Sequence, residues 1–291
     1  MWDFDKTLIP GYMQDPMFEK FGVDAESFWF EANRTYGDYN DSEINVSLEA
    51  IILNQILRYA KVGTFHGLNN QLLKQLGGEI EFYEGLPDFF KLTRDFLESK
   101  SEYRLHNISL EHYIVSTGLR QMILGSKIEP FVDGVWGCEF LDNNSGTCIN
   151  EISFFLDHTT KTRAIFEINK GSNKFPIDVN ATIDLKERRV PFENMIYVAD
   201  GPSDVPVFSV IKHSQGRTYA VYPSGSNEDY SKAKKLLDDG RVHSFGEANY
   251  GVDSATYKWL FATLEEIADR IVDEKNSRLG RKVKSPPRHT T

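Results

Sequence analysis

The chain has 291 residues, of which 40% are hydrophobic, and a formal net charge of −10. This is enough material for one large domain or for a core with a smaller domain. The negative charge argues against a general nucleic-acid or anionic-membrane binder, because phosphates are held by surplus lysine and arginine. Two cysteines, Cys138 and Cys148, cannot form a disulfide framework, and no signal peptide or long apolar run is evident. We therefore expect a soluble, cytoplasmic protein with reduced thiols.

An acidic pair, Asp3 and Asp5, stands at the start of the chain. Side chains of an extended segment alternate faces with period two, so both carboxylates can face one reacting centre. One carboxylate of such a pair can act as a nucleophile while the other exchanges protons. Only Met1 and Trp2 precede the pair, so the strand that presents it either begins upstream of this sequence or is a short stub.

The next region, residues 15–84, reads as helices. Apolar residues recur in it at three- and four-residue spacing, as Leu48, Ile51 and Ile52 show, and Ser42 is a plausible helix start. Proline and glycine at residues 10–11 break the chain before this region, and a glycine pair at 77–78 closes it. The predicted helices span residues 16–21, 25–36, 42–62 and 68–76.

From residue 85 onward, helices alternate with short apolar strands. The run 195–199 is almost wholly apolar, which is typical of a strand buried on both faces in a parallel sheet. Polar residues at 142–146 predict a hairpin turn. The alternation predicts a doubly wound α/β sheet, with sites beyond the carboxyl ends of its strands. Predicted strands are 112–115, 132–140, 195–199, 218–223 and 241–245, and predicted helices are 88–97, 119–124, 160–168, 229–237 and 255–272.

Three predicted strands end in polar residues suited to chemistry. They end in Asp-Phe-Asp-Lys-Thr at residues 3–7, in Ser-Thr-Gly at 116–118 and in Asp-Gly-Pro-Ser-Asp at 200–204, and Lys161 lies near a helix start between the last two. Phosphoryl transfer needs an in-line nucleophile, neutralised phosphoryl oxygens and a metal. These residue types can supply the nucleophile and the neutralising charge, and they can bind the metal. In this order, the motifs resemble those of the haloacid dehalogenase-like (HAD) superfamily, on its phosphatase side.

The resemblance implies a Rossmann-like core and a role for each motif residue. Asp3 would be the nucleophile that forms an aspartyl-phosphate, and Asp5 the general acid and base. Asp200 would be the direct Mg²⁺ ligand, together with Asp3 and the backbone carbonyl of Asp5, while Asp204 would orient a metal-bound water or Lys161. The implied phosphate-binding residues are Thr7, Ser116, Thr117, Gly118 and Lys161. Lys170 and Lys174 lie in the same region, so the choice of lysine stays open.

The second carboxylate of the pair bears on the type of reaction. A halide leaves without a proton, whereas an alkoxide must be protonated as it departs, so Asp5 favours hydrolysis of a small phosphate ester. A phosphomutase or phosphotransferase would use the same residues, and a catalytically silent binding protein could retain the fold. These alternatives stay open, as does the oligomeric state.

The resemblance also implies a division of the chain. Relatives of phosphoserine phosphatase carry a helical cap between the first and second motifs, where it closes over the site and selects the leaving group. They also carry a glutamate nine residues after the nucleophile for the substrate amine, and this chain has Tyr12 there. The resemblance therefore does not extend to the substrate. We expect an α/β core at 1–14 and 85–277, a helical cap at 15–84 and a disordered basic tail at 278–291.

Overall fold

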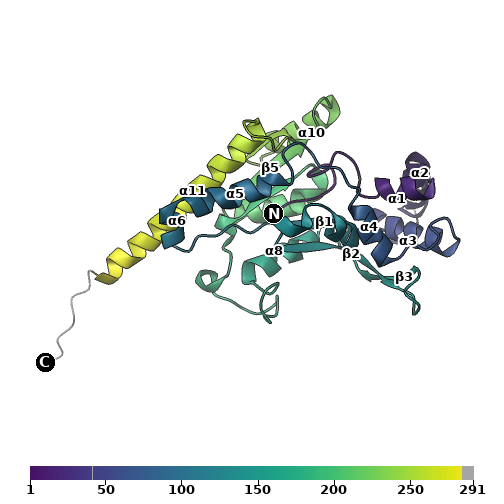
Figure 1. The fold of residues 1–291 in the computed structure, drawn as a ribbon, viewed down its shortest axis with the longest axis horizontal. Coiled ribbons are helices and arrows are strands. Elements are labelled where there is room, and N and C mark those ends of the chain that lie inside the picture. The colour runs from purple at the N-terminus through teal and green to yellow at the C-terminus, as the bar shows by residue number, and fades with distance from the viewer. Residues whose placement is uncertain (41, 284–291) are drawn as a thin grey trace.

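A sheet of mostly parallel strands lies at the centre of the computed structural model, which describes residues 1–40 and 42–283 (Figure 1). Strand β1 pairs with β2 in parallel, and β4, β5 and β6 pair in parallel in that order. β3 pairs with β2 antiparallel, which confirms the hairpin predicted around residues 142–146. The strands are β1 (Tyr113–Leu119), β2 (Gly134–Asp142), β3 (Ile149–Phe154), β4 (Ile196–Ala199), β5 (Arg217–Tyr222) and β6 (Ser244–Glu247).

The start of the chain joins the two halves of this sheet. Trp2 forms parallel bridges to Ile114 of β1 and to Val198 of β4. Its amide donates to the carbonyl of Tyr113 at 2.9 Å, and the amide of Asp3 donates to the carbonyl of Val198 at 3.0 Å. The central position of the sheet is therefore held by a stub of about three residues rather than by a full strand.

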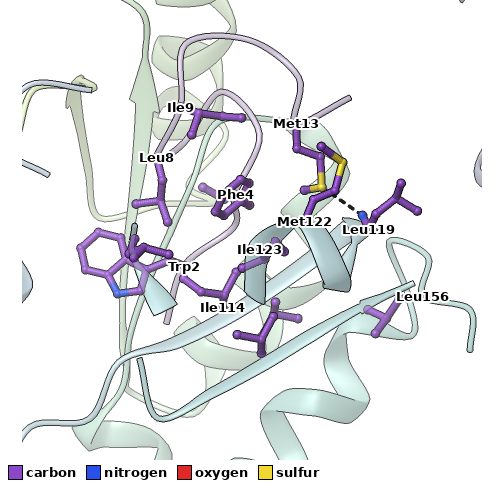
Figure 2. Packing of buried hydrophobic residues seen from close by; sticks show 14 of the residues in the cluster. Trp2, Phe4, Leu8, Ile9, Met13, Ile114, Leu119, Met122, Ile123 and Leu156 are labelled. Atoms are coloured by element: carbon purple, nitrogen blue, oxygen red, sulfur yellow. Dashed lines mark hydrogen bonds between the residues drawn. The ribbon is translucent and has the colours of Figure 1, made fainter. Parts of the chain in front are cut away.

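Side chains along this stub point alternately toward the hydrophobic core and toward the acidic residues' side. Trp2 and Phe4 are 4% and 0% exposed, and they pack with Ile114 in the main hydrophobic cluster (Figure 2). Phe4 lies between the two acidic residues, so its burial turns Asp3 and Asp5 together toward the opposite side.

Helices cover both faces of the sheet, as a doubly wound fold requires (Figure 1). α5 (Asp88–Ser99) packs against α11 (Ala255–Val283), where the rings of Phe89 and Phe261 lie 5.8 Å apart. α8 (Lys161–Lys170) packs against α9 (Val205–His213). The fold class predicted from the sequence is confirmed, although α9 and α6 were not predicted. The other core helices are α6 (Ser101–Leu105), α7 (Arg120–Gly125) and α10 (Asn227–Asp238).

Two sequence-based boundaries differ most from the structure. α3 begins at Leu48 rather than at Ser42, because the hydroxyl of Ser47 accepts a hydrogen bond from the amide of Ala50 and caps the helix. α11 continues to Val283, so the disorder predicted from residue 278 does not apply to residues 278–283. The rest of that predicted tail lies outside the described residues.

Four helices fill most of the region between the first two motifs, and they are bound firmly to the core. α4 packs on α7 so closely that a Cβ added to Gly125 would lie 1.7 Å from the carbonyl oxygen of Lys74. The amide of Ile149 in β3 donates to the carbonyl of Leu68 at 2.7 Å. No helix of the described residues is long and apolar enough to cross a membrane. The four helices are α1 (Asp15–Phe21), α2 (Ala25–Asn40), α3 (Leu48–Lys61) and α4 (Asn70–Gly77).

Candidate active site

Three carboxylates converge where the central stub and β4 end. Asp3 follows the stub, and Asp200 and Asp204 follow β4, in the turn that leads into α9. One carboxylate oxygen of each residue lies within 4.8 Å of those of the other two. Asp3 and Asp204 are buried, and Asp200 is partly exposed. Neighbouring parallel strands end at the same edge of a sheet, which explains how residues so distant in sequence meet.

Lys161 balances part of this negative charge. Its Nζ lies 2.7 Å from Oδ1 of Asp3 and 2.8 Å from Oδ1 of Asp204, and its side chain is only 1% exposed. Burial by itself would lower the pKa of Lys161, but the carboxylates of Asp204 and Asp3 outweigh it and raise the pKa. The lysine therefore stays charged and bridges the two strand ends.

The other two candidate lysines have different partners. Nζ of Lys170 donates to the carbonyl of Ala181 at 2.8 Å and also to that of Val179. Lys174 pairs with Glu111 at 3.1 Å, near the start of β1. Of the three lysines considered from the sequence, Lys161 is the one that contacts the acidic cluster.

Asp204 is held by groups that the sequence reasoning missed. The hydroxyl of Tyr197 donates to its Oδ1 at 2.5 Å, and the hydroxyl of Ser203 donates to its Oδ2 at 3.0 Å. Tyr197 is completely buried in β4. A tyrosine inside an otherwise apolar strand was the available signal, because a buried phenol needs a hydrogen-bond partner.

Burial and crowding raise the pKa of the acidic groups. Burial raises the pKa of Asp3 to about 6 despite the opposing effect of Lys161. Burial, followed by the charges of Asp3 and Asp204, raises the pKa of Asp200 well above its usual value. Three carboxylates with one lysine leave an excess of negative charge in a poorly hydrated place, and a bound divalent cation would relieve it.

Asp5 lies apart from the three clustered carboxylates, in a setting that keeps it protonated. Its Oδ1 accepts the backbone N–H of Met13 at 2.9 Å. Burial, with a further contribution from the charge of Asp3, raises the pKa of Asp5 to about 8. Near neutral pH this carboxyl therefore carries a proton that it can donate.

Residues 116–118 form a bulged loop within the last part of β1, where the register with β2 shifts between Val115 and Leu119. Ser116 is 1% exposed, and its Oγ accepts the N–H of Gly118 at 3.0 Å, which leaves its hydroxyl hydrogen free to donate. The carbonyl of Thr117 accepts the thiol hydrogen of Cys138 at 3.3 Å. In this loop, the hydroxyl of Ser116 is the group suited to a phosphoryl oxygen.

Thr7 has a buried hydroxyl without a partner. It is 0% exposed, and its Oγ1 makes no hydrogen bond among the described residues. Its backbone carbonyl accepts the hydroxyl of Tyr250 at 2.7 Å, which fixes the loop after Asp5. Buried hydroxyls are normally paired, so the free Oγ1 is a candidate contact for a bound group.

Residues next to the helical insert border the same site. Lys6 has a positive φ of 55°, which is uncommon for a residue other than glycine, and its Nζ lies 4.6 Å from the ring centroid of Tyr12. The ring of Tyr12 lies 4.9 Å from that of Trp29 in α2. On the α3 side, Glu49 pairs with His158 at 2.7 Å, three residues before Lys161. The insert therefore contacts the loops that carry the candidate site.

Comparison with solved structures tests the predicted fold. A HAD-family hydrolase from Salmonella enterica subsp. enterica serovar Typhi superposes with a TM-score of 0.53 at 15% identity, over 84% of this chain and 65% of that chain. The chain thus spans about two thirds of the length of that hydrolase. A phosphoserine phosphatase, solved as an analogue of its phospho-aspartyl intermediate, gives a TM-score of 0.46 at 16% identity, over 84% of this chain and 90% of that chain. The chain therefore shares the fold of this HAD-family hydrolase, which is the fold that the motifs predicted.

A sequence relative places the chain in a narrower group. An uncharacterized protein of Borreliella burgdorferi (strain ATCC 35210 / DSM 4680 / CIP 102532 / B31) is 38% identical over 282 residues, which cover 89% of this chain and 94% of that protein. The chain belongs to one family with this Borreliella protein. No protein-family model matches the chain.

Proposed function

We propose that the protein is a Mg²⁺-dependent phosphomonoester hydrolase that works through an aspartyl-phosphate on Asp3. The observation that carries this proposal is the convergence of Asp3, Asp200, Asp204 and Lys161 within hydrogen-bonding or metal-binding reach of one another. Membership of the HAD fold supports the hydrolase class. Asp5 supports a phosphate ester over a halide as substrate, because it can protonate a departing alkoxide.

In the first step, a carboxylate oxygen of Asp3 attacks phosphorus and the bond from phosphorus to the alcohol oxygen breaks. Lys161 occupies Oδ1 of Asp3, so Oδ2 is the oxygen without that ion pair. Asp5 gives its proton to the departing oxygen, and the alcohol leaves neutral. The hydroxyl of Ser116 and the charge of Lys161 stabilise the transferring phosphoryl group.

In the second step, water replaces Asp3 on phosphorus. Asp5, now a carboxylate, removes a proton from the water, and the oxygen of that water bonds to phosphorus as the bond to Asp3 breaks. Inorganic phosphate leaves, and Asp5 is protonated again. The free hydroxyl of Thr7 and the backbone of Thr117 and Gly118 lie in the loops that we assign to phosphate binding.

The donors present fit magnesium. Asp3 and Asp200 offer hard carboxylate oxygens, the backbone carbonyl of Asp5 is a third oxygen donor, and Asp204 orients Lys161 beside them. Mg²⁺ prefers a few oxygen ligands of this kind and leaves room for water and phosphate. When bound, the ion would neutralise negative charge on the phosphoryl group and on the clustered carboxylates.

We further propose that the substrate is a small phosphorylated metabolite and that the helical insert, residues 15–84, acts as a cap that excludes bulk water from the site. Contacts of α2 and α3 with the site loops, through Trp29 and Glu49, support this role. Free thiols at Cys138 and Cys148 are consistent with the expected cytoplasmic location.

The proposal is tested with an aryl phosphate and Mg²⁺. We expect release of inorganic phosphate by the wild-type chain, none by Asp3→Asn, and normal release by Asp38→Asn, a matched change on the exposed surface of α2. Calorimetry with Mg²⁺ and trifluoroberyllate should detect binding that Asp200→Asn removes. Full activity of Asp3→Asn would exclude the covalent mechanism, and transfer of phosphate to added alcohols would indicate a phosphotransferase. A screen of phosphorylated metabolites would then identify the substrate.

A further inference from the structure

Met13 connects the two halves of the candidate site. It is 0% exposed and lies two residues before α1, on the segment that leads into the helical insert. Its backbone N–H donates to Oδ1 of Asp5 at 2.9 Å. Its Sδ accepts the backbone N–H of Leu119 at 3.0 Å, on the strand that carries Ser116 (Figure 2). One residue thus contacts both the candidate general acid and the candidate phosphate-binding loop.

The loop has a space that only this side chain fills. A Cβ built on Gly118 would lie 2.2 Å from Cε and 2.6 Å from Sδ of Met13, and 3.3 Å from Oγ of Ser116. The first two distances are far shorter than van der Waals contact, so a larger residue at position 118 would displace the end of the Met13 side chain. Gly118 also donates its N–H to Ser116 at 3.0 Å, and the loop is therefore fixed on its other side.

The contact made by sulfur restricts an otherwise adaptable side chain. Methionine has three rotatable bonds, and its thioether is a weak acceptor. The N–H of Leu119 holds this acceptor at one end, and packing on Gly118 holds the methyl group. Met13 is thus held at two points, by the hydrogen bond of its backbone N–H to Asp5 and by that of its sulfur to Leu119. Oδ1 of Asp5 is thereby occupied, which leaves Oδ2 as the oxygen that can exchange a proton with the substrate.

We propose that Met13 is a positioning residue that, through its contacts with Gly118 and Leu119, holds the Asp5 carboxyl in the orientation needed to protonate the leaving group. This inference rests on the proposed phosphatase function. It follows that the effect of changing Met13 on the rate depends on the leaving group of the substrate. An alkoxide needs the proton of Asp5, whereas a nitrophenolate leaves readily without it. Loss of the Met13 contact should therefore slow the hydrolysis of alkyl phosphates selectively.

The experiment compares two substrates, 4-nitrophenyl phosphate and an alkyl phosphate such as glycerol phosphate. The variants are Met13→Leu, which keeps the volume but removes the sulfur acceptor, and Gly118→Ala, which pushes the side chain away. For each we expect kcat on the alkyl phosphate to fall about tenfold, a part of the roughly 100- to 10,000-fold that a positioned general acid contributes. In Met13→Leu we expect kcat on the aryl phosphate to change by less than about twofold. Met17→Leu, the same change at a buried methionine of α1, is the control and should leave both rates unchanged.

A variant that lacks the general acid distinguishes a positioning role of Met13 from general damage to the site. In Asp5→Asn there is no acid to orient, so adding Met13→Leu should cause no further change in the ratio of the two rates. In addition, Met13→Ala combined with Gly118→Ala should recover the packing that Gly118→Ala alone disturbs. Equal losses on both substrates in Met13→Leu, or an additional selective loss when Met13→Leu is added to Asp5→Asn, would overturn the inference. A wild-type chain that hydrolyses neither substrate would instead refute the proposed function.

Discussion

Nζ of Lys161 lies 2.7 Å from Oδ1 of Asp3, although 158 residues separate them in the sequence. The same Nζ lies 2.8 Å from Asp204. A buried lysine between two carboxylates ties the end of the central stub, the start of α8 and the turn after β4 into one unit.

Replacement of Lys161 by methionine should remove both activity and stability. The two buried carboxylates would lose their compensating charge, and the free energy of unfolding should fall by about 3 kcal/mol. Turnover of an aryl phosphate should fall at least about 100-fold, because a fixed charge that stabilises the phosphoryl group is lost. Urea denaturation and initial rates measure the two effects. Lys174→Met is the matched control, and a normal rate in Lys161→Met would show that this lysine has no role in turnover.

Tyr197→Phe should weaken the metal site without a change in shape. The substitution removes the hydroxyl that donates to Oδ1 of Asp204 and leaves the ring in the core. Loss of a group that orients a metal-site residue typically lowers metal affinity by about 10- to 100-fold. Mg²⁺ titration by calorimetry measures this change. Tyr219→Phe, which loses a buried hydroxyl bonded to Thr256, should bind Mg²⁺ normally. Equal affinities in the two variants would refute the role of Tyr197.

His112 should make the fold sensitive to acid. Its Nδ1 accepts the indole N–H of Trp2 at 3.2 Å, so the neutral ring carries its proton on Nε2, which faces Thr93 at 3.1 Å. Burial lowers the pKa of His112 well below its usual value. Below a pH of about 6.5, His112 of the unfolded chain binds a proton that the buried ring of the folded chain does not bind. The free energy of unfolding therefore falls by up to about 1.4 kcal/mol per pH unit.

Chemical denaturation at several values between about pH 8 and pH 5 measures how the free energy of unfolding depends on pH. The difference in unfolding free energy between wild type and His112→Gln should shrink as pH falls, because the variant has no such proton to take up. A difference that is constant with pH would mean that His112 titrates alike in both states.

Gly125→Ala should damage the junction between the helical insert and the core. The new Cβ would lie 1.7 Å from the carbonyl oxygen of Lys74, and backbone on both sides prevents easy relief. We expect the free energy of unfolding to fall by about 3 kcal/mol, the upper part of the usual range for overpacking. Gly37→Ala, in an exposed turn of α2 with open space around it, should instead stabilise by up to about 1 kcal/mol. Thermal melts compare the stability of the two variants. Equal melting temperatures would contradict the tight packing of α4 on α7 at Gly125.

The sequence was sufficient for most of the elements in their order, although α6 and α9 were missed, and for the chemistry of the strand ends. The apolar run 195–199 predicts a buried strand, because a strand inside a parallel sheet needs apolar residues on both faces. The start of α3 was misjudged because Ser42 and Ser47 are both acceptable caps. Only packing of the following residues decides between two such serines.

Side-chain partners were decided by the tertiary structure. Spacing along the chain could not distinguish Lys161 from Lys170 and Lys174, since all three lie in or near one helix. The fold distinguishes them because only the first turn of α8 is brought to the acidic cluster. Likewise, the phenol of Tyr197 and the thioether of Met13 acquire their roles from atoms more than five residues away in sequence.

The sequence by itself thus determined which residue types stand at the ends of which strands, because local propensity and apolar periodicity act over short stretches of chain. The three-dimensional fold decided which of those residues meet, how they are charged and which neighbours orient them. Contact, burial and electrostatic interaction depend on distance in space, and chain order does not specify that distance.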